Sequence, residues 1–484
     1  METEKSEFKK SLGFIDSTAL VAGSMIGSGI FIVSADIARN VGAPGWMLIV
    51  WVITGIMTIF AALSYGELAS MMPKAGGQYV YIREAFNPLA GFLYGWTFFT
   101  VIQTGTIAAV AMAFAKFAGV LIPWFSESNI LISFGFIKIS TVHLLAITMI
   151  LLLTGNNLLG IRNGKWVQNI FTFLKIALLI GFIILGLFFA KNPEAIAMNN
   201  SYFWQPVALD GATLSGWALI ASIGVAMVGS LFSSDAWNNI TFAAAEVKNP
   251  KRNIPLSLVT GVTLVTILYI LANFVYLNAL PLRGMTDGAG VFERGIQHAV
   301  NDRLGSASMF GLFGSTAALM MAAFVVISTF GCNNGLILSG ARVYYAMAKD
   351  NLFFKSAGIL NKNSVPAAGL KVQAVWASLL CLSGTYSNLL DYVVFAVLIF
   401  YVLTIAGIFV LRRKMPDAER PYKTFGYPVV PVIYMASACL IMFILLIYRW
   451  EYSGAGLVIV ILGFPVYYIW KRRGNKMDEQ NQNR

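Results

Sequence analysis

The sequence predicts an all-α integral membrane protein. Of its 484 residues, 58% are hydrophobic and only 12% are charged, whereas an average soluble domain is about 25% charged. The mean hydropathy is +0.72. Apolar runs of about 17–25 residues or more, long enough to cross a bilayer as helices, recur along the whole chain. A chain this apolar cannot hide its surface in one soluble core, so we interpret these runs as membrane-spanning helices.

Twelve such runs can be counted, and they leave polar tails at residues 1–13 and 472–484. The runs cover residues 14–38, 46–72, 88–119, 139–155, 167–190, 214–246, 255–279, 310–349, 369–386, 390–412, 428–448 and 454–471. An even number of spans puts both termini on one side. With that side inside, the inner segments hold about three times as many Lys and Arg residues as the outer ones, which predicts cytoplasmic termini. The expected location is the plasma membrane. The net charge of +12 is then explained by basic loops that face the lipid surface, and not by a nucleic-acid partner.

Two of these spans contain interruptions rich in glycine and serine. The first span reads GSMIGSG from Gly23 to Gly29, and the sixth reads GSLFSSDAWNN from Gly229 to Asn239. Spans 1 and 6 cross the membrane in opposite directions, and paired breaks of this kind are typical of transporters built from inverted repeats, with the ligand at mid-membrane. We therefore expect helices 1 and 6 to be discontinuous. The repeats would cover 14–190 and 214–412, with two further helices over 428–471.

The first break offers groups that suit a carboxylate. A helix that stops near Gly23 and restarts near Gly29 presents free N–H groups and the positive end of a helix dipole, and Ser28 adds a hydroxyl donor. Close helix packing through small residues is the alternative interpretation, and Gly23 with Gly27 fits it. The matching break in the sixth span favours a binding site. The candidate ligand-binding residues here are Ser24, Met25, Ile26, Gly27, Ser28 and Gly29.

The second break contributes four candidates: Phe232, Ser233, Asp235 and Asn238. Phe232 could cover a bound ligand, although a single aromatic ring is more often simply packed. Asp235 lies near mid-membrane, where an ionisable group indicates function. It could attract a ligand ammonium or take up a proton. Alternatively, Ser234 or Asp235 caps the restarted half-helix.

Two further charged residues lie within spans. Lys175 is about 12 Å deep, counted at 1.5 Å per residue, and could stand where another transporter holds a cation. Its alternative is to extend toward the membrane surface. Glu67, near the inner end of the second span, is expected to pair with an arginine of an inner loop.

The sequence contains no motif for a disulfide framework, a metal site, nucleotide binding or enzyme catalysis. Cys332, Cys381 and Cys439 lie in apolar runs without the spacing of a disulfide framework or a metal site, and His143 and His298 are too far apart in the sequence to suggest one. No phosphate loop, HExxH or GxSxG motif occurs. We therefore expect no enzyme activity, no catalytic residues, no metal and no cofactor, and transport would draw on a gradient or on exchange.

The chain resembles the amino-acid permeases of the amino acid–polyamine–organocation (APC) superfamily, and within it the L-type amino acid transporter group. The resemblance covers about residues 12–430. Its motifs are GSMIGSGIF in span 1, SYGELASMMPKAGGQYVYIREAF after span 2, AAEVKNPKRNIPLSL after span 6, SGARVYYAMAKDNLF at the end of span 8 and LRRKMPDAERPYKTFGYPVVP after span 10.

The resemblance implies a LeuT-type fold with the substrate between broken spans 1 and 6. In this family the carboxylate is bound at the positions matching Ser28 and Gly29, with Gly27 close by. The amino group meets carbonyls at the positions matching Met25 and Phe232, and Phe232 also matches the outer gate.

The resemblance also bears on coupling and partners. Lys175 matches a lysine that stands where sodium sits in sodium-coupled relatives, which implies sodium-independent transport, often by obligatory exchange. In span 6, Asp235 and Ala236 replace two glycines of the pattern F-A-Y-G-G-W-N. Animal members join a heavy chain through a cysteine between spans 3 and 4. This chain has none there, so no disulfide-linked heavy chain is expected.

Three functions follow as hypotheses. The first is sodium-independent exchange of neutral L-amino acids. The second is proton-coupled symport of amino acids or amines, with Asp235 as the titrating group. The third is a nutrient receptor with a transporter-like body that binds without flux.

Overall fold

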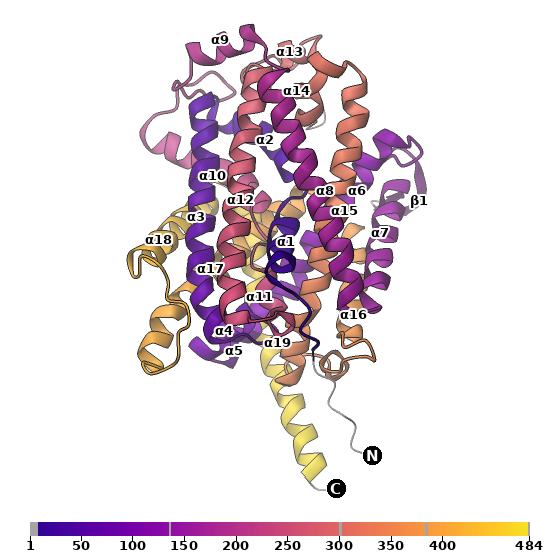
Figure 1. Cartoon of the computed structure of the whole chain (residues 1–484), viewed down its shortest axis with the longest axis vertical. Coiled ribbons are helices and arrows are strands. Elements are labelled where there is room, and N and C mark those ends of the chain that lie inside the picture. The colour runs from indigo at the N-terminus through magenta and orange to yellow at the C-terminus, as the bar shows by residue number, and fades with distance from the viewer. Residues whose placement is uncertain (1–7, 135–136, 300–302, 383–385, 483–484) are drawn as a thin grey trace.

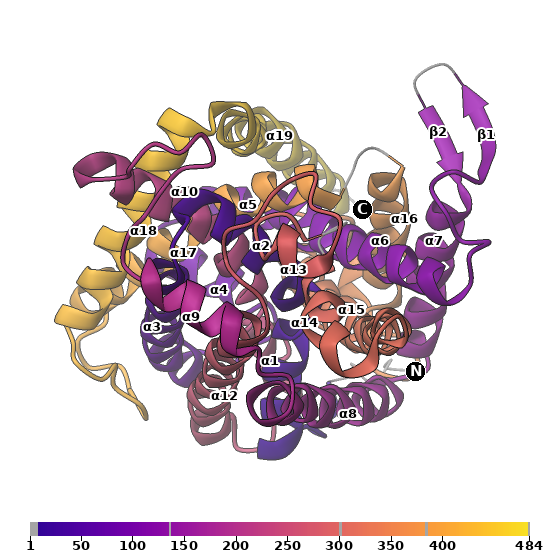
Figure 2. The same cartoon turned by 90° about the horizontal axis from the view of Figure 1, so that it is seen from above.

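The computed structural model describes residues 8–134, 137–299, 303–382 and 386–482. Most of its helices run along one long axis, and a small β-hairpin projects from the side (Figures 1 and 2). Within the described residues, ten helices are long and apolar enough to cross a membrane, so the chain is a multi-pass membrane protein. They are α3 (Pro44–Met71), α5 (Pro88–Thr97) continued through a π-helical turn at Phe98–Ile102 into α6 (Gln103–Leu121), α7 (Thr141–Leu158), α8 (Ile161–Phe188), α10 (Gly216–Ser233), α12 (Pro250–Ala279), α15 (Thr316–Lys349), α17 (Tyr386–Lys414), α18 (Val429–Tyr448) and α19 (Trp450–Gln482).

One further span is a bent pair. Helix α1 (Phe14–Met25) and helix α2 (Gly29–Val41) raise the number of spans to eleven when they are counted as one. The predicted span at 369–386 corresponds to α16 (Ala367–Cys381), an apolar helix of 15 residues. Twelve spans therefore stay a prediction.

Short elements join these helices. They are α4 (Gln78–Ala85), β1 (Ile130–Phe134), β2 (Ile137–Ser140), α9 (Pro193–Ser201), α11 (Asn239–Phe242), the 3-10 turn η2 (Ala244–Glu246), α13 (Val291–Arg294), α14 (Leu304–Phe313) and the 3-10 turn η4 (Lys355–Gly358). The antiparallel pair β1–β2 departs from the purely helical prediction. Its segments are rich in β-branched isoleucine, which favours strands. The predicted run 310–349 is also divided, because Gly314 adopts a φ of +54° between α14 and α15.

The packing of the helices brings the bend between α1 and α2 close to the end of α10. Helix α1 packs against α8, α12 and α15, and α2 packs against α10 and α3. Seen from above, α1 and α2 lie inside the ring of longer helices, while the hairpin and α18 lie at opposite edges (Figure 2). The end of α1, the start of α2 and the end of α10 therefore meet inside the molecule.

We call the end of the molecule where α4, α5 and the C-terminal part of α19 lie the lower end (Figure 1). Charged side chains link the helices there. The Glu67 carboxylate accepts hydrogen bonds from Arg412 at 2.7 Å and from the backbone N–H of Thr424 at 2.7 Å. It also forms an ion pair with Arg420, so the predicted pairing of Glu67 with arginine is confirmed.

A second tie joins the start of the chain to the segment after the second break. The backbone carbonyl of Glu246 accepts hydrogen bonds from the N–H groups of Ser11 and Leu12, at 2.9 and 3.0 Å. The carboxylate of Glu246 forms a buried ion pair with Arg342 of α15, at 3.0 Å. Polar contacts as well as packing thus hold the elements of the lower end together.

Candidate functional site

The first break separates α1 and α2 by a short extended stretch. Helix α1 ends at Met25, Ile26 has an extended ψ of 95°, and α2 begins at Gly29 with Ser28 as its N-cap residue. The two helix axes differ by 43°. The last carbonyl groups of α1 and the first N–H groups of α2 consequently lack partners within their own helices.

The carbonyl groups at the end of α1 accept hydrogen bonds from side chains of three other helices. The donors are Lys175 to Gly23 and Ile26 (2.5 and 2.7 Å), Cys332 to Ser24 (2.9 Å), Tyr269 to Met25 (3.0 Å), and Ser328 to Ile26 and Gly27 (3.1 and 3.0 Å). These side chains come from α8, α12 and α15. They satisfy buried backbone groups that would otherwise cost about 1–3 kcal/mol each.

Lys175 is fully buried in this cluster. Its Nζ also lies 3.3 Å from the carbonyl oxygen of Ser328. The alternative in which Lys175 extends to the membrane surface is therefore wrong, because the carbonyl groups hold the ammonium inside. A positive charge at the C-terminal end of α1 is also favoured by the helix dipole.

The glycines of the first break allow neighbouring side chains to pack closely against the backbone. A Cβ added at Gly29 would lie 2.1 Å from Ser233 Oγ, and one at Gly23 would lie 2.1 Å from Thr172 Oγ1. At Gly27 the nearest atom would be Cys332 Sγ, at an ordinary 3.4 Å. Small residues are thus required by tight packing at Gly23 and Gly29. The packing interpretation applies at these two positions, and the ligand-binding interpretation stays a prediction.

The second break differs in its local structure. Helix α10 ends at Ser233, and α11 begins only at Asn239, with Asn238 as its N-cap residue. Ala236 between them has a φ of +63°, a left-handed conformation that costs an L-residue about 1–2 kcal/mol. No side chain caps α11, so the alternative in which Ser234 or Asp235 acts as its cap is wrong.

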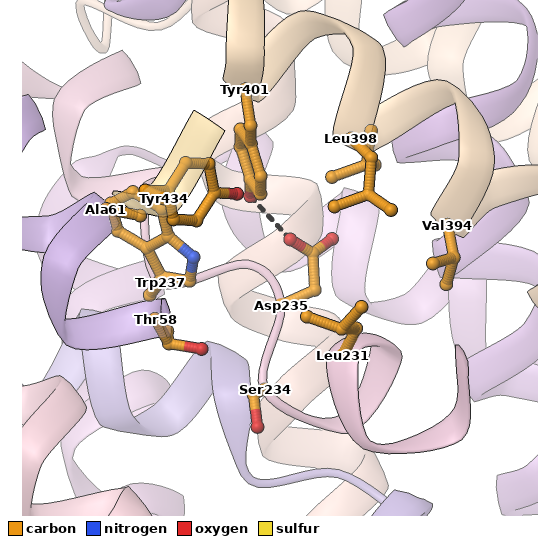
Figure 3. Close-up of a pocket in the computed structure, with 11 residues that line it drawn as sticks. Thr58, Ala61, Leu231, Ser234, Asp235, Trp237, Val394, Leu398, Tyr401 and Tyr434 are labelled. Atoms are coloured by element: carbon orange, nitrogen blue, oxygen red, sulfur yellow. Dashed lines mark hydrogen bonds between the residues drawn. The ribbon is translucent and has the colours of Figure 1, made fainter. Parts of the chain in front are cut away.

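The Asp235 side chain is directed away from α11. Its carboxylate accepts a hydrogen bond from the hydroxyl of Tyr401 in α17, at 2.5 Å (Figure 3). Leu231 and Leu398 lie nearby, and Trp237 lies on the other side of the tyrosine contact. Among the described residues, no cationic side chain forms an ion pair with Asp235. The carboxylate is therefore held by a neutral donor in largely apolar surroundings.

Two small cavities adjoin Asp235, each of about 20 Å³, which is room for about one water molecule. Asp235, Val397 and Tyr401 line both of them. Thr58 and Tyr434 complete one wall of the first, and Gln78 and Gln103 belong to the second. A bound amino acid would require these side chains to move apart.

The structure brings some predicted site residues together and separates others. Tyr269 joins the two breaks, because its hydroxyl lies 3.0 Å from the carbonyl oxygen of Met25 and 3.2 Å from that of Ser233. Phe232 is buried in the last turn of α10 beside them. Asn238 instead donates to Gln78 of α4, at 2.9 Å. The residues of the first break thus adjoin the end of α10, whereas Asp235 and Asn238 face α17 and α4.

Sequence reasoning missed the residues that hold the two breaks. They are Tyr269 of α12, Ser328 and Cys332 of α15, and Tyr401 of α17. One signal was available: Tyr269, Asn273 and Tyr276 recur at helical spacing on one face of an apolar span, and each makes a buried hydrogen bond. Tyr401 carries no such pattern.

Comparisons with known proteins bear on the family of this chain. A family model described as amino acid permease matches residues 12–465. The b(0,+)-type amino acid transporter 1 of Mus musculus is 29% identical over 468 residues, which cover 96% of this chain and 89% of that protein. The large neutral amino acids transporter small subunit 2 of Homo sapiens is 31% identical over 470 residues, which cover 95% of this chain and 80% of that protein.

Proposed function

The chain belongs to the amino acid permease family of the APC superfamily, whose relatives are amino acid transporters and not enzymes, and on that basis we propose that it exchanges neutral L-amino acids across the plasma membrane by sodium-independent alternating access. The observation that carries the proposal is the pair of helix breaks joined by Tyr269. Backbone groups of both signs lie close together there, as a zwitterionic ligand requires.

The proposed ligand pose follows from those backbone groups. The α-carboxylate binds the amides at the start of α2 at Ser28 and Gly29, where the helix dipole favours negative charge, with Gly27 close by. The α-amino group donates to the carbonyls of Met25 and Phe232. Met25 already accepts from Tyr269, and Phe232 already accepts from the backbone N–H groups of Ser234 and Asp235. Because a carbonyl oxygen has two lone pairs, Met25 can accept the ligand as a second donor, whereas Phe232 must release one of its present donors.

Sodium independence is supported by Lys175. Its ammonium lies among the carbonyl oxygens of Gly23, Ile26 and Ser328, and a cluster of oxygen atoms is the surrounding that a sodium ion would need. A fixed cation at this point removes the need for a dissolved one.

The alternating-access part of the proposal rests on a LeuT-type arrangement. Residues 14–190 and 214–412 would form inverted repeats, with one break in each, and residues 428–471 would be appended helices. Cytoplasmic termini would place the lower end inside the cell. No disulfide-linked heavy chain is required in this arrangement, since residues 122–140, between α6 and α7, contain no cysteine.

Counterflow in proteoliposomes tests the proposal. Vesicles loaded with unlabelled leucine should accumulate labelled external leucine, and empty vesicles should not. Replacement of sodium by choline should leave the rate unchanged. Binding without any flux would identify a nutrient receptor instead, and a sodium requirement would contradict the role given to Lys175.

Asp235 favours one second candidate, proton-coupled symport of amino acids or amines. A carboxylate that lines both cavities and accepts a hydrogen bond from the neutral hydroxyl of Tyr401 is suited to gain a proton or to meet a ligand ammonium. An inward proton gradient would then drive uptake into empty vesicles, and Asp235→Asn would abolish this drive. The exposed Asp210 provides the matched control in Asp210→Asn. Uptake that is equal at every pH in both variants would remove Asp235 from coupling.

A further inference from the structure

A basic cleft opens at the lower end, and none of the residues of the two helix breaks lines it. It has a volume of about 650 Å³ and lies between the start of the described chain and the first turns of α8. Its lining carries five cationic side chains and one carboxylate. The charged residues are Lys9, Lys10, Arg162, Lys165, Lys248 and Asp16.

Most of this positive charge is not neutralised by the described protein. Asp16 is occupied, because its carboxylate accepts from Lys165 at 3.0 Å and from Asn169 at 2.7 Å. The side chains of Lys9, Lys10, Arg162 and Lys248 are exposed, and within residues 8–134, 137–299, 303–382 and 386–482 only Lys165 of the five cations forms an ion pair. The cleft therefore presents four charges to an outside anion.

The wall of the cleft continues into an apolar stripe on α8. Trp166, Ile170 and Phe173 recur at helical spacing on one face and are 58%, 55% and 56% exposed. In a spanning helix, exposed apolar side chains of this kind meet lipid. Trp166 belongs to both the cleft and the stripe, as is typical of a tryptophan at the boundary between headgroups and acyl chains.

The length of α8 places the cleft among the headgroups. Its 28 residues extend about 42 Å at 1.5 Å per residue, whereas the hydrocarbon core is about 30 Å thick. The first turns of α8, which carry Arg162 and Lys165, therefore lie at the level of the lipid phosphates.

We propose that this cleft binds the anionic headgroup of a membrane phospholipid, with the acyl chains along the α8 stripe. The cationic side chains meet the phosphate, and the roomy cleft accepts the polar part of the headgroup. Basic pockets at the cytoplasmic ends of spanning helices suit such lipids. The site is independent of the ligand pose between the two helix breaks.

A lipid titration of the full chain in detergent tests this site. Dioctanoyl phosphatidylglycerol should raise the melting temperature saturably, and dioctanoyl phosphatidylcholine should not. The variant Lys9→Gln/Lys10→Gln/Arg162→Gln should raise the half-saturating concentration on the order of 100-fold, since each cation near an anionic headgroup contributes about fivefold. These three side chains are exposed, so the variant should fold.

The matched control neutralises three other exposed cations at the same end, in Lys355→Gln/Arg413→Gln/Lys423→Gln, and should leave the titration unchanged. Equal weakening in both triple variants would mean a diffuse surface attraction and overturn the proposal.

Two further outcomes would also overturn it. If inorganic phosphate at matched ionic strength stabilises the chain as well as phosphatidylglycerol does, the cleft takes a free anion and not a lipid. The sequence also carries Glu2, Glu4 and Glu7, outside the described residues. If the lipid has no saturable effect until these three are changed to Gln, the cleft is occupied by the chain's own acidic residues.

Discussion

The break between α1 and α2 and the break between α10 and α11 are neighbours in space but are held in different ways. At the first, side chains from three surrounding helices hold the free carbonyl groups, and Lys175 alone contacts two of them. At the second, the backbone bonds mostly to itself, as in the contacts from Asp235 to Phe232 and from Asn239 to Ala236. The first break is therefore fixed by its neighbours, whereas the second is set by local turns and one strained residue.

Under the proposed transport function, we expect this difference to reflect separate roles. The first break, held by side chains of three helices, is then suited to recognise the constant part of an amino acid. The second break, with one left-handed residue at Ala236, is then the one expected to change conformation. Variants that loosen the first break or relax the second can therefore test the comparison.

Lys175→Ala should have the largest effect. It removes the ammonium and leaves buried carbonyl groups of Gly23 and Ile26 with fewer donors, at a cost of about 3 kcal/mol. Exchange should fall more than tenfold, and sodium chloride should raise the melting temperature of the variant more than choline chloride does. The exposed Lys191 gives the control, Lys191→Ala, which should behave as wild type. Full exchange by Lys175→Ala would show that the first break does not need its fixed cation.

Gly29→Ala should come next, because its Cβ would overlap Ser233 of the second break. Overpacking of this kind costs about 1–3 kcal/mol, and leucine affinity in a binding assay should fall with stability. Gly27→Ala is the matched control, since it has room beside Cys332. A second change, Ser233→Gly, removes the overlapping atoms and should restore part of the loss. If Gly29→Ala and Gly27→Ala have the same stability and the same leucine affinity, the two breaks are less closely packed than described.

Tyr269→Phe removes the hydroxyl that contacts both Met25 and Ser233 and so links the two breaks. The free energy of unfolding should fall by about 1 kcal/mol. Tyr276→Phe loses a buried hydrogen bond to Ile30 alone and should cost a similar amount of stability. The exchange rate should fall severalfold only in Tyr269→Phe. Similar exchange rates in the two variants would mean that Tyr269 stabilises the fold without linking the breaks.

Ala236→Gly should have the smallest effect and the opposite sign. Glycine relieves the positive φ and should raise stability by about 1 kcal/mol, measured as a higher melting temperature. Ala226→Gly, inside α10, should lower it, since glycine is unfavourable in a helix. A lower melting temperature for Ala236→Gly would argue against strain at the second break.

The sequence was sufficient for the features that depend on pattern. Apolar length identified the spanning helices, and the family motifs agree with the permease match. The runs of small residues coincide with the bend between α1 and α2 and with the end of α10 at Ser233. The pairing of Glu67 with arginine was predictable because an acid at the end of a span needs a cation close by, and Arg412 and Arg420 are its partners.

Other features depend on three-dimensional contacts that no local pattern carries. Asp235 is turned toward Tyr401, which is 166 residues away in the chain, so its direction could not be read from the residues around it. Lys175 had two plausible positions, and only the carbonyl groups of α1 and α15 decide between them. The β-hairpin was missed because its isoleucines resemble the apolar run that follows.

The contacts of Glu246 at the lower end offer an observable that requires no mutation and no attached probe. The amides of Ser11 and Leu12 are protected only while they donate to the Glu246 carbonyl, and they exchange with solvent deuterium when that contact opens. Hydrogen–deuterium exchange of the N-terminal peptide should therefore report how often the lower end opens in the unmodified protein. Its change on addition of leucine would give the direction in which a ligand shifts that equilibrium.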